Sequence, residues 1–346
     1  MTHHRISNGS YRPPVWLPGG HAQTLWPLLR KGPFPVLQRE RWDTPDGDFI
    51  DVDWLPHIPG SPLVILFHGL EGSSSSPYAR ALMRLLSDKG WNGVIPHFRG
   101  CSGEPNRLPR AYHSGDADEI DWILERIASQ HPQIPRYGAG VSLGGNALLL
   151  WLGTRGNAAG PVLKAAAAIC PPLDLSAAGH TLGKGFNLIY TRHFLTTLKR
   201  NAAAKLLQYP GLFDQARMLA SRTLYEFDDL VTAPLHGYRN VDDYWQKASS
   251  KPHLSGIRVP TLIINPRNDP FLPADHLPTP QDVSAQVSLE QPSDGGHVGF
   301  VSGPWPGHLE WLPHRLLAFF TEARPSGQSP PGTAGYHDAP RIIQAS

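Results

Sequence analysis

The chain has 346 residues, which is enough for one large domain or two smaller ones with a substantial buried core. Its net charge of +2, with no run of Lys and Arg, argues against a nucleic-acid partner. Its two cysteines, Cys101 and Cys170, lie far apart, which excludes a disulfide scaffold and a zinc ribbon and is typical of a reducing compartment.

No stretch approaches the ~18 consecutive apolar residues of a membrane span. The first eight residues contain no apolar run of the kind found in secretory signals. We therefore expect no integral membrane span and a cytoplasmic location. The oligomeric state is left open by the sequence.

The N-terminal part of the chain predicts an arm followed by a hairpin. Residues 1–35 are polar and rich in Pro and Gly, so we expect an irregular arm that is packed by its aromatic side chains. Residues 36–42 and 48–54 have strand character and flank the turn sequence Pro45-Asp46-Gly47. This arrangement predicts an antiparallel hairpin at the start of a sheet.

Strand and helix patterns then alternate. The apolar run 62–67 predicts a strand buried on both faces, and Pro77 is well placed to begin a helix. Ser114 is expected to be the N-cap of the next helix. Further strands are expected at 94–98, 136–141 and 162–170, and a further helix over 147–152. Such alternation is typical of a mostly parallel, doubly wound α/β sheet.

The alternation stops near residue 173. Residues 174–253 have helical patterns and no convincing strand, so we expect a helical lid inserted over the active-site face. Strand patterns return at 259–265 and 285–289, and a closing helix begins near Pro313. The expected parts are an arm (1–35), a core (36–173 and 254–323), the lid (174–253) and a disordered tail rich in Pro, Gly and Ser (324–346).

The sequence Gly140-Val141-Ser142-Leu143-Gly144 stands between an expected strand and an expected helix. A serine on a sharp strand-to-helix turn needs a strained backbone, and neighbouring glycines remove the Cβ clashes that would forbid it. The alternative is a glycine-rich turn whose serine only caps the helix. The flanking strand and helix favour Ser142 as a nucleophile.

A serine nucleophile needs a base and a carboxylate, which follow it in the order acid, then histidine, in proteins with this turn. Among 17 histidines, His297 stands between the last strand and the last helix, preceded by two glycines. Asp269 follows the strand that ends near residue 265 and is the preferred acid. Asp174 is the alternative, although it could equally cap the first lid helix.

Two backbone N–H groups are expected to bind the oxyanion. One is that of Leu143, directly after the nucleophile. The other is that of Leu70, in the loop that follows the strand 62–67. The alternative for the sequence His68-Gly69 is an ordinary turn at a strand end.

Several motifs together resemble the YheT-like branch of the α/β-hydrolases, bacterial relatives of the eukaryotic ABHD-type lipid esterases. The matching segments are 20–24, 68–72, 98–106, 140–146, 225–229, 232–237, 268–271 and 296–300. They span about residues 17 to 322. The resemblance therefore covers nearly the whole chain except the expected tail.

The resemblance implies an α/β-hydrolase fold and hydrolysis of carboxylic esters by Ser142, Asp269 and His297. Short- to medium-chain acyl esters are the implied substrates, with acylglycerols and other lipids among them. No metal or organic cofactor is implied. The membrane anchor of the eukaryotic relatives is not carried over to this chain. The motif 20–24 has no assigned role, and the loop 99–104 is expected to shape the floor of the site.

Other functions remain open at this stage. An acyltransferase or thioesterase could use the same fold, and His113 and Asp118 match a short H-x4-D pattern sometimes associated with acyl transfer, although chance explains so short a match. A non-catalytic binding protein on the same fold is a further alternative. Cys101 lacks a strand-turn-helix setting and is not expected to be a nucleophile. Haloalkane dehalogenases and epoxide hydrolases need an aspartate where Ser142 stands.

Overall fold

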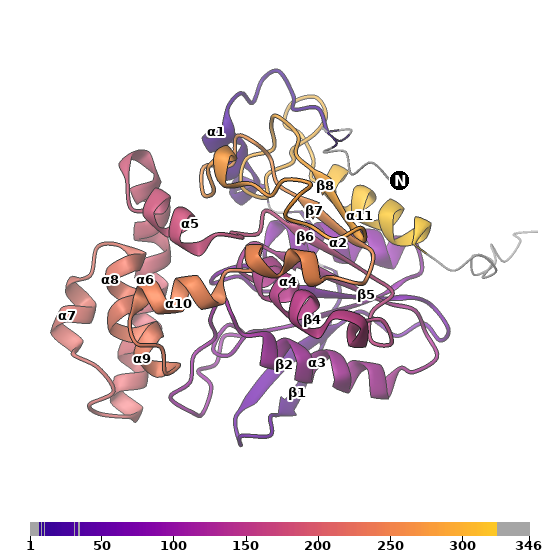
Figure 1. Cartoon of the computed structure of the whole chain (residues 1–346). Helices are drawn as coiled ribbons and strands as arrows, with labels where there is room; N and C mark the ends of the chain where they lie inside the picture. The colour runs from indigo at the N-terminus through magenta and orange to yellow at the C-terminus, as the bar shows by residue number, and fades with distance from the viewer. Residues whose placement is uncertain (1–6, 8, 10, 31, 34, 324–346) are drawn as a thin grey trace, which may run out of the picture.

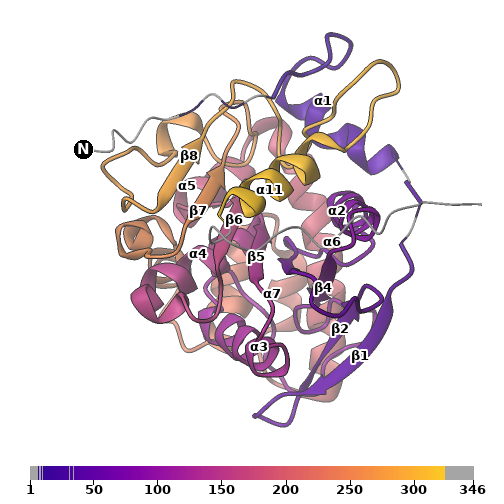
Figure 2. The ribbon, with the colours of Figure 1, turned by 90° about the vertical axis from the view of Figure 1, so that its right-hand side faces the viewer.

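The computed structural model describes residues 7, 9, 11–30, 32–33 and 35–323. Its centre is one eight-stranded sheet with the order β1-β2-β4-β3-β5-β6-β7-β8, which Figure 2 shows from β8 on the left to β1 at the lower right. The strands are Gln38–Asp43 (β1), Phe49–Trp54 (β2), Leu63–Phe67 (β3), Asn92–Pro96 (β4), Arg136–Val141 (β5), Ala165–Ile169 (β6), Thr261–Ile264 (β7) and Val287–Glu290 (β8). Strands β3 to β8 are parallel, and β1 and β2 form the predicted antiparallel hairpin.

Helices cover both faces of the sheet, as predicted for a doubly wound fold (Figure 1). They are α2 (Pro77–Asp88) and α11 (Trp311–Glu322) on one face, and α3 (Ala117–Gln130) and α4 (Leu143–Arg155) on the other. Alternate residues of β3 supply the two cores. Val64 and Leu66 pack towards α2 and α11, whereas Ile65 and Phe67 pack towards α3 and α4. A strand buried on both faces must be apolar throughout, which explains the uninterrupted run in the sequence.

Residues 174–253, all of which are described, contain helices and no strand. The helices are α5 (Leu175–Leu182), α6 (Leu188–Gln208), α7 (Gln215–Ala220), α8 (Leu224–Phe227), α9 (Ala233–Leu235) and α10 (Val241–Ala248). They lie together on one side of the sheet, at the left in Figure 1, around an apolar core of their own. Among the residues that the structure describes, no helix is both long enough and apolar enough to cross a bilayer. The expected tail, 324–346, lies outside the described residues.

Three local expectations differ from the structure. The arm is not wholly irregular, because it contains a short helix α1 (Gly20–Leu25) and a 3-10 turn η1 (Trp26–Leu29). The strand expected at 94–98 begins and ends two residues earlier. Ser114 is not the cap of α3, which begins after Asp116. The N–H of Ser114 donates instead to the Tyr244 hydroxyl at 2.9 Å, so tertiary contacts decide its role.

The register of the central strands brings their carboxyl ends into line. Phe67 is paired with Gly140, Val141 with Ile169, and Ile169 with Ile264. The residues that follow these strands therefore lie side by side at one edge of the sheet, where ligands bind in open α/β folds.

Candidate active site

Ser142 occupies the turn between β5 and α4 in a conformation that residues other than glycine rarely adopt. Its φ of 51° and ψ of −120° indicate backbone strain. A Cβ on Gly140 would lie 2.6 Å from the carbonyl oxygen of Gly144, and a Cβ on Gly144 would collide with the carbonyl oxygens of Phe67 and His68. Glycine at both positions allows the sharp turn that presents the Ser142 hydroxyl at the end of the sheet.

The three side chains singled out in the sequence meet at this edge. His297 Nε2 lies 3.0 Å from Ser142 Oγ, and His297 Nδ1 lies 2.9 Å from Asp269 Oδ2. The Asp269 side chain is buried, whereas that of His297 is 11% exposed. Phe271 stacks on the imidazole with ring centroids 3.9 Å apart, and its N–H donates to Asp269 Oδ1 at 2.8 Å. The imidazole is thus oriented by a carboxylate and lies within hydrogen-bond reach of a hydroxyl, as a general base must be.

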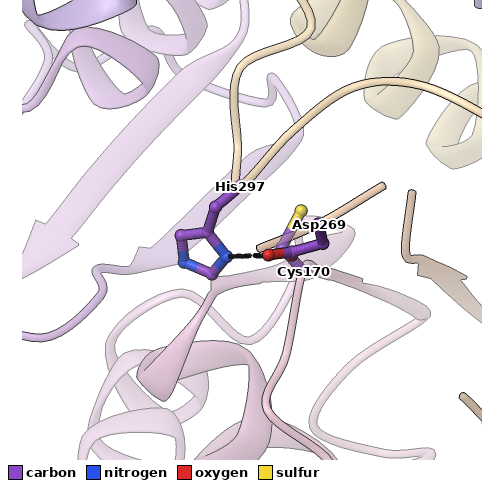
Figure 3. Close-up of side chains that lie close together, drawn as sticks. All are labelled: Cys170, Asp269 and His297. Carbon is purple, nitrogen blue, oxygen red and sulfur yellow. Dashed lines mark hydrogen bonds and ion pairs between the residues drawn. The ribbon is translucent and has the colours of Figure 1, made fainter. Parts of the chain in front are cut away.

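Cys170, directly after β6, lies beside this pair, as Figure 3 shows with His297 and Asp269. The N–H of Val298 points to its Sγ at 3.3 Å, which ties the histidine loop to the sheet. Burial, and to a smaller extent the charge of Asp269, raise the pKa of Cys170 well above its ordinary value. Because the thiol is protonated and the other two side chains are hydrogen-bonded to each other, this cluster suits acid–base chemistry better than metal binding.

Gln23 of α1 connects the loops that carry Asp269 and His297. Its fully buried Oε1 accepts hydrogen bonds from the Gly295 N–H at 2.8 Å and from the Asn268 side-chain amide at 3.0 Å. Asn268 directly precedes the acid, and Gly295 lies two residues before the histidine. Gln23 therefore bridges the two loops, which are also joined directly by the bonds of Asn268 to Asp294 and Gly296.

Thr24 holds the histidine loop from the same helix. Its hydroxyl accepts from the His297 N–H at 2.8 Å and donates to the Gly20 carbonyl at 2.6 Å. A Cβ on Gly296 would lie 2.7 Å from that carbonyl oxygen, so the loop packs directly on the backbone of α1. These contacts reveal the role of the motif 20–24. Sequence reasoning missed it because the partners lie more than 240 positions away.

In the loop after β3, the Leu70 N–H lies between two N–H groups that already donate hydrogen bonds. The N–H of Gly69 donates to the Tyr78 hydroxyl at 2.9 Å, and that of Glu71 donates to the Tyr112 hydroxyl at 2.8 Å. Neither the Leu70 N–H nor the Leu143 N–H donates to an acceptor in the described part of the chain. Both leucines line the cavity that contains the Ser142 hydroxyl, so their amides are free to bind a ligand oxygen there.

His68 has a structural role that the sequence did not reveal. It is completely buried, and its Nε2 accepts from the Phe98 N–H at 3.1 Å while its Nδ1 lies 2.8 Å from the Gly69 carbonyl. Burial lowers the pKa of His68 to about 3, so it is neutral. The ring braces the ends of β3 and β4 beneath the Leu70 loop.

The alternative acid, Asp174, caps the first lid helix. Its carboxylate accepts from the Ala177 N–H at 2.9 Å and lies 3.0 Å from His276 Nδ1. The structure thus brings Asp269, and not Asp174, to His297.

The loop 99–106 binds the β1–β2 hairpin, and its part in the expected floor of the site is indirect, because Cys101 packs against the apolar cluster that contains Leu143 and against which Leu70 also packs. Arg99 donates to Glu119 at 2.6 Å, and Asn106 donates to Asp48 at 2.6 Å. This loop lines neither of the cavities next to the nucleophile. A buried guanidinium must be paired, and its carboxylates come from the hairpin turn and α3. Burial raises the pKa of Cys101 far above its ordinary value, so this thiol is no rival nucleophile.

The H-x4-D pattern does not form a catalytic pair. His113 packs against His236, with ring centroids 4.1 Å apart. Burial, followed by the charge of Arg110, lowers the pKa of His113 to about 3. Asp118 lies in the first turn of α3, where a carboxylate stabilises the helix dipole. Packing and helix initiation therefore account for the pattern.

Two cavities meet at Ser142. The first has about 850 Å³ of empty space, including its mouth, and lies between the sheet and the lid. Its lid wall is mostly apolar and includes Leu175, Leu182, Leu198, Leu224 and Trp245. The second has about 1220 Å³, including open solvent at its mouth, and lies between the arm and α6. A substrate bound at Ser142 can therefore extend in two directions.

Comparison with known proteins agrees with this architecture. The profile of the alpha/beta hydrolase fold family matches residues 62–304. The chain belongs to the α/β-hydrolase family. A relative named as an esterase, YheT of Escherichia coli strain K12, is 40% identical over 307 residues, covering 87% of this chain and 90% of the relative. Human phospholipase ABHD3 is 30% identical over 332 residues, covering 93% and 80% respectively.

Solved structures of other proteins share the fold. The esterase EaEST of Exiguobacterium antarcticum matches with a TM-score of 0.52 at 16% identity, covering 82% of this chain and all of that one.

The sequence relatives assign this α/β hydrolase to the YheT-like branch that its motifs resemble. It is an ester-hydrolysing enzyme of the esterase and lipase type.

Proposed function

We propose that this α/β hydrolase cleaves carboxylic esters through a covalent acyl-enzyme, with Ser142 as nucleophile, His297 as general base and acid, and Asp269 as the residue that orients the imidazole. The observation that carries the proposal is the pair of contacts on one imidazole, 3.0 Å to the Ser142 hydroxyl and 2.9 Å to the Asp269 carboxylate. The strained turn at Ser142 supports it, because strain of this kind is concentrated at functional sites.

In the proposed reaction, Ser142 Oγ attacks the ester carbonyl while His297 Nε2 takes its proton. The imidazolium, stabilised by Asp269, then gives that proton to the departing alcohol, which leaves an acyl group on Ser142. Water attacks this acyl-enzyme with the same histidine as base, and the carboxylic acid is released. The chain's own residues provide every proton transfer in this sequence.

The Leu70 and Leu143 N–H groups are the proposed oxyanion donors. Their positions at the turn of β3 and at the first residue of α4 support this role, and the positive end of α4 adds to it. Loss of one such donor typically lowers turnover by about 10²–10³-fold.

We further propose that the first cavity takes the acyl chain and the second takes the alcohol part. The apolar lid wall of the first cavity favours short- to medium-chain acyl groups. The second cavity is wider and opens to solvent, so it can accept a larger alcohol such as that of a lipid. The printed names of two relatives, a phospholipase and a monoacylglycerol lipase, support lipid esters as the substrate class.

A fluorophosphonate probe tests the nucleophile, and p-nitrophenyl esters from acetyl to palmitoyl test the acyl range. We expect labelling of the wild type, labelling of a Ser129→Ala control whose exposed hydroxyl donates to the Arg126 carbonyl of its own helix, and none of Ser142→Ala. We expect turnover to be highest for short and medium chains. Labelling of Ser142→Ala at the wild-type rate would contradict the mechanism. An added alcohol acceptor would reveal a transferase if ester product exceeded free acid.

A further inference from the structure

Exposed apolar side chains border the entrance of the second cavity. Leu28 of η1 and Ile189 of α6 line this cavity and are 60% and 50% exposed. Leu29, Phe186 and Leu188 are their neighbours in the chain and are also exposed. These five side chains, called the entrance rim below, make up five of the eleven large apolar side chains that are well exposed in the described residues. Apolar exposure is thus concentrated at this opening, which is typical of an interaction site.

The two segments of the entrance rim form one surface. The ring of His21 in the arm packs at a tilt against Phe186, with ring centroids 4.5 Å apart. The same ring places Nδ1 3.0 Å from the Tyr190 hydroxyl of α6. The arm and the start of α6 are therefore held together at the cavity entrance.

The two segments that carry the rim contain positively charged residues and no negatively charged ones. Residues 1–39 and 175–213 contain five Lys and Arg each, and neither segment contains any of the 29 Asp and Glu. Arg30, Lys184 and Arg192 stand next to the rim, and their side chains are exposed. None of these three forms an ion pair with a described residue. A chain of net charge +2 therefore places unpaired positive charge around this one opening.

We propose that the entrance rim docks on the surface of an anionic lipid bilayer. Apolar side chains that enter the headgroup region and cations that meet lipid phosphates are the two features of such binding. The position of the rim argues against a protein partner. A protein seated there would close the way to Ser142, whereas a bilayer would place lipid at the cavity entrance. The inference rests on the proposed function in one respect, namely that the bilayer supplies the lipid ester. Binding to the bilayer does not itself require turnover.

Vesicle flotation tests the proposal on the full chain carrying Ser142→Ala, so that lipid is not consumed. Vesicles of phosphatidylcholine alone are compared with vesicles that also contain phosphatidylglycerol. We expect binding to the mixed vesicles and little binding to phosphatidylcholine alone. Added salt should weaken the binding, because it screens exposed charges beyond about 10 Å at 0.1 M. Equal binding to both vesicle types, or no binding to either, would overturn the proposal.

Variants locate the surface. Leu29→Ser with Arg30→Glu changes one rim position and the cation next to it, and neither residue lines a cavity at Ser142. We expect this variant to lower the partition coefficient at least about tenfold. The matched controls are Leu207→Ser, 86% exposed at the other end of α6, and Lys89→Glu, exposed after α2. Both controls should bind as the parent does. Control variants that lose binding as strongly as the rim variant would overturn the assignment.

Three further measurements distinguish membrane docking from misfolding, from loss of catalysis and from self-association. When the rim variant is made with Ser142 intact, it should hydrolyse water-soluble p-nitrophenyl butyrate as fast as the wild type and melt at the same temperature. For the chain without rim substitutions, ester turnover with no vesicle binding would overturn the docking surface alone, whereas vesicle binding with no ester turnover would contradict the proposed function alone. If the rim variant instead changes the oligomeric mass and leaves vesicle binding unchanged, the rim is a contact between copies and the proposal fails.

Discussion

Replacement of Gln23 by methionine should disable the site from a position that never touches the substrate. Methionine keeps the length of the side chain and removes its hydrogen bonds. In the native protein Gln23 Oε1 accepts from Gly295 and Asn268, and its Nε2 donates to the Leu17 carbonyl at 3.1 Å. Asn268 retains a second partner in Asp294 at 2.9 Å. Gln23→Met therefore leaves two buried backbone groups, the Gly295 N–H and the Leu17 carbonyl, without partners.

The cost can be worked from these contacts. Each buried unsatisfied group costs about 1–3 kcal/mol, so the free energy of unfolding should fall by about 2–6 kcal/mol. The protein should remain folded at 25 °C if its stability exceeds that loss, as it does over most of the usual range of about 5–15 kcal/mol. The loop carrying His297 would lose its tie to α1 through Gln23, although Asn268 would keep its direct bonds to Asp294 and Gly296. Because a displacement of about 1 Å at a catalytic group can cost about 10²-fold, we expect kcat to fall about 10–100-fold.

The assay is hydrolysis of p-nitrophenyl butyrate at 25 °C, combined with the rate of fluorophosphonate labelling and a thermal melt. Gln291→Met is the matched control, since Gln291 is 3% exposed and donates one hydrogen bond, to the Pro278 carbonyl at 2.7 Å. The control should lose stability and keep its labelling rate. If Gln23→Met melts earlier and yet labels as fast as the control, the reasoning that Gln23 positions the histidine loop is refuted.

Three further predictions rest on contacts elsewhere in the molecule. Gly69→Ala would place a Cβ 3.2 Å from the Cβ of Ser142, so kcat should fall about 10–100-fold with little change in melting temperature, whereas Gly160→Ala, which meets only an ordinary 3.5 Å contact, should leave both unchanged. Burial, with repulsion from a neighbouring carboxylate, raises the pKa of Glu119 to about 7, above its unfolded value of 4.5. The native state therefore holds this proton more tightly, and stability should decline as pH rises from about 4.5 to above 7, a decline that urea melts of Glu119→Gln should lack. Leu198→Trp should fill part of the first cavity and shift the preference among p-nitrophenyl esters to shorter acyl chains. An unchanged preference would contradict the proposal that the acyl chain binds in that cavity.

Local signals in the sequence were sufficient for most of the elements. The strand β5 has the predicted bounds because the glycine-flanked turn at Ser142 marks where it must end. Pro77 begins α2 because proline fits the first turn of a helix and no later one. Local signals failed at Ser114, because the N-cap position of α3 is Asp116, two residues further along the chain. The hydroxyl of Tyr244, from a lid helix, engages the Ser114 N–H, and no local pattern contains that information.

The candidate triad was predictable because chain order and strand ends restrict the choices. The acid was the exception, since Asp174 and Asp269 both follow strands of the sheet. Only the tertiary contact distinguishes them, because Asp174 faces His276 while Asp269 faces His297.

The sequence by itself determined the alternation of strands and helices and the glycines that make a strained turn possible at Ser142. Periodicity and backbone sterics act over a few residues, so they can be read from a short stretch. Tertiary structure alone decided what supports the site. The six-residue helix α1 is too short to be stable in isolation and is held by its contacts, and its Gln23 bonds to Gly295, 272 positions away. Contacts over that distance depend on how the whole sheet is assembled, which no local pattern encodes.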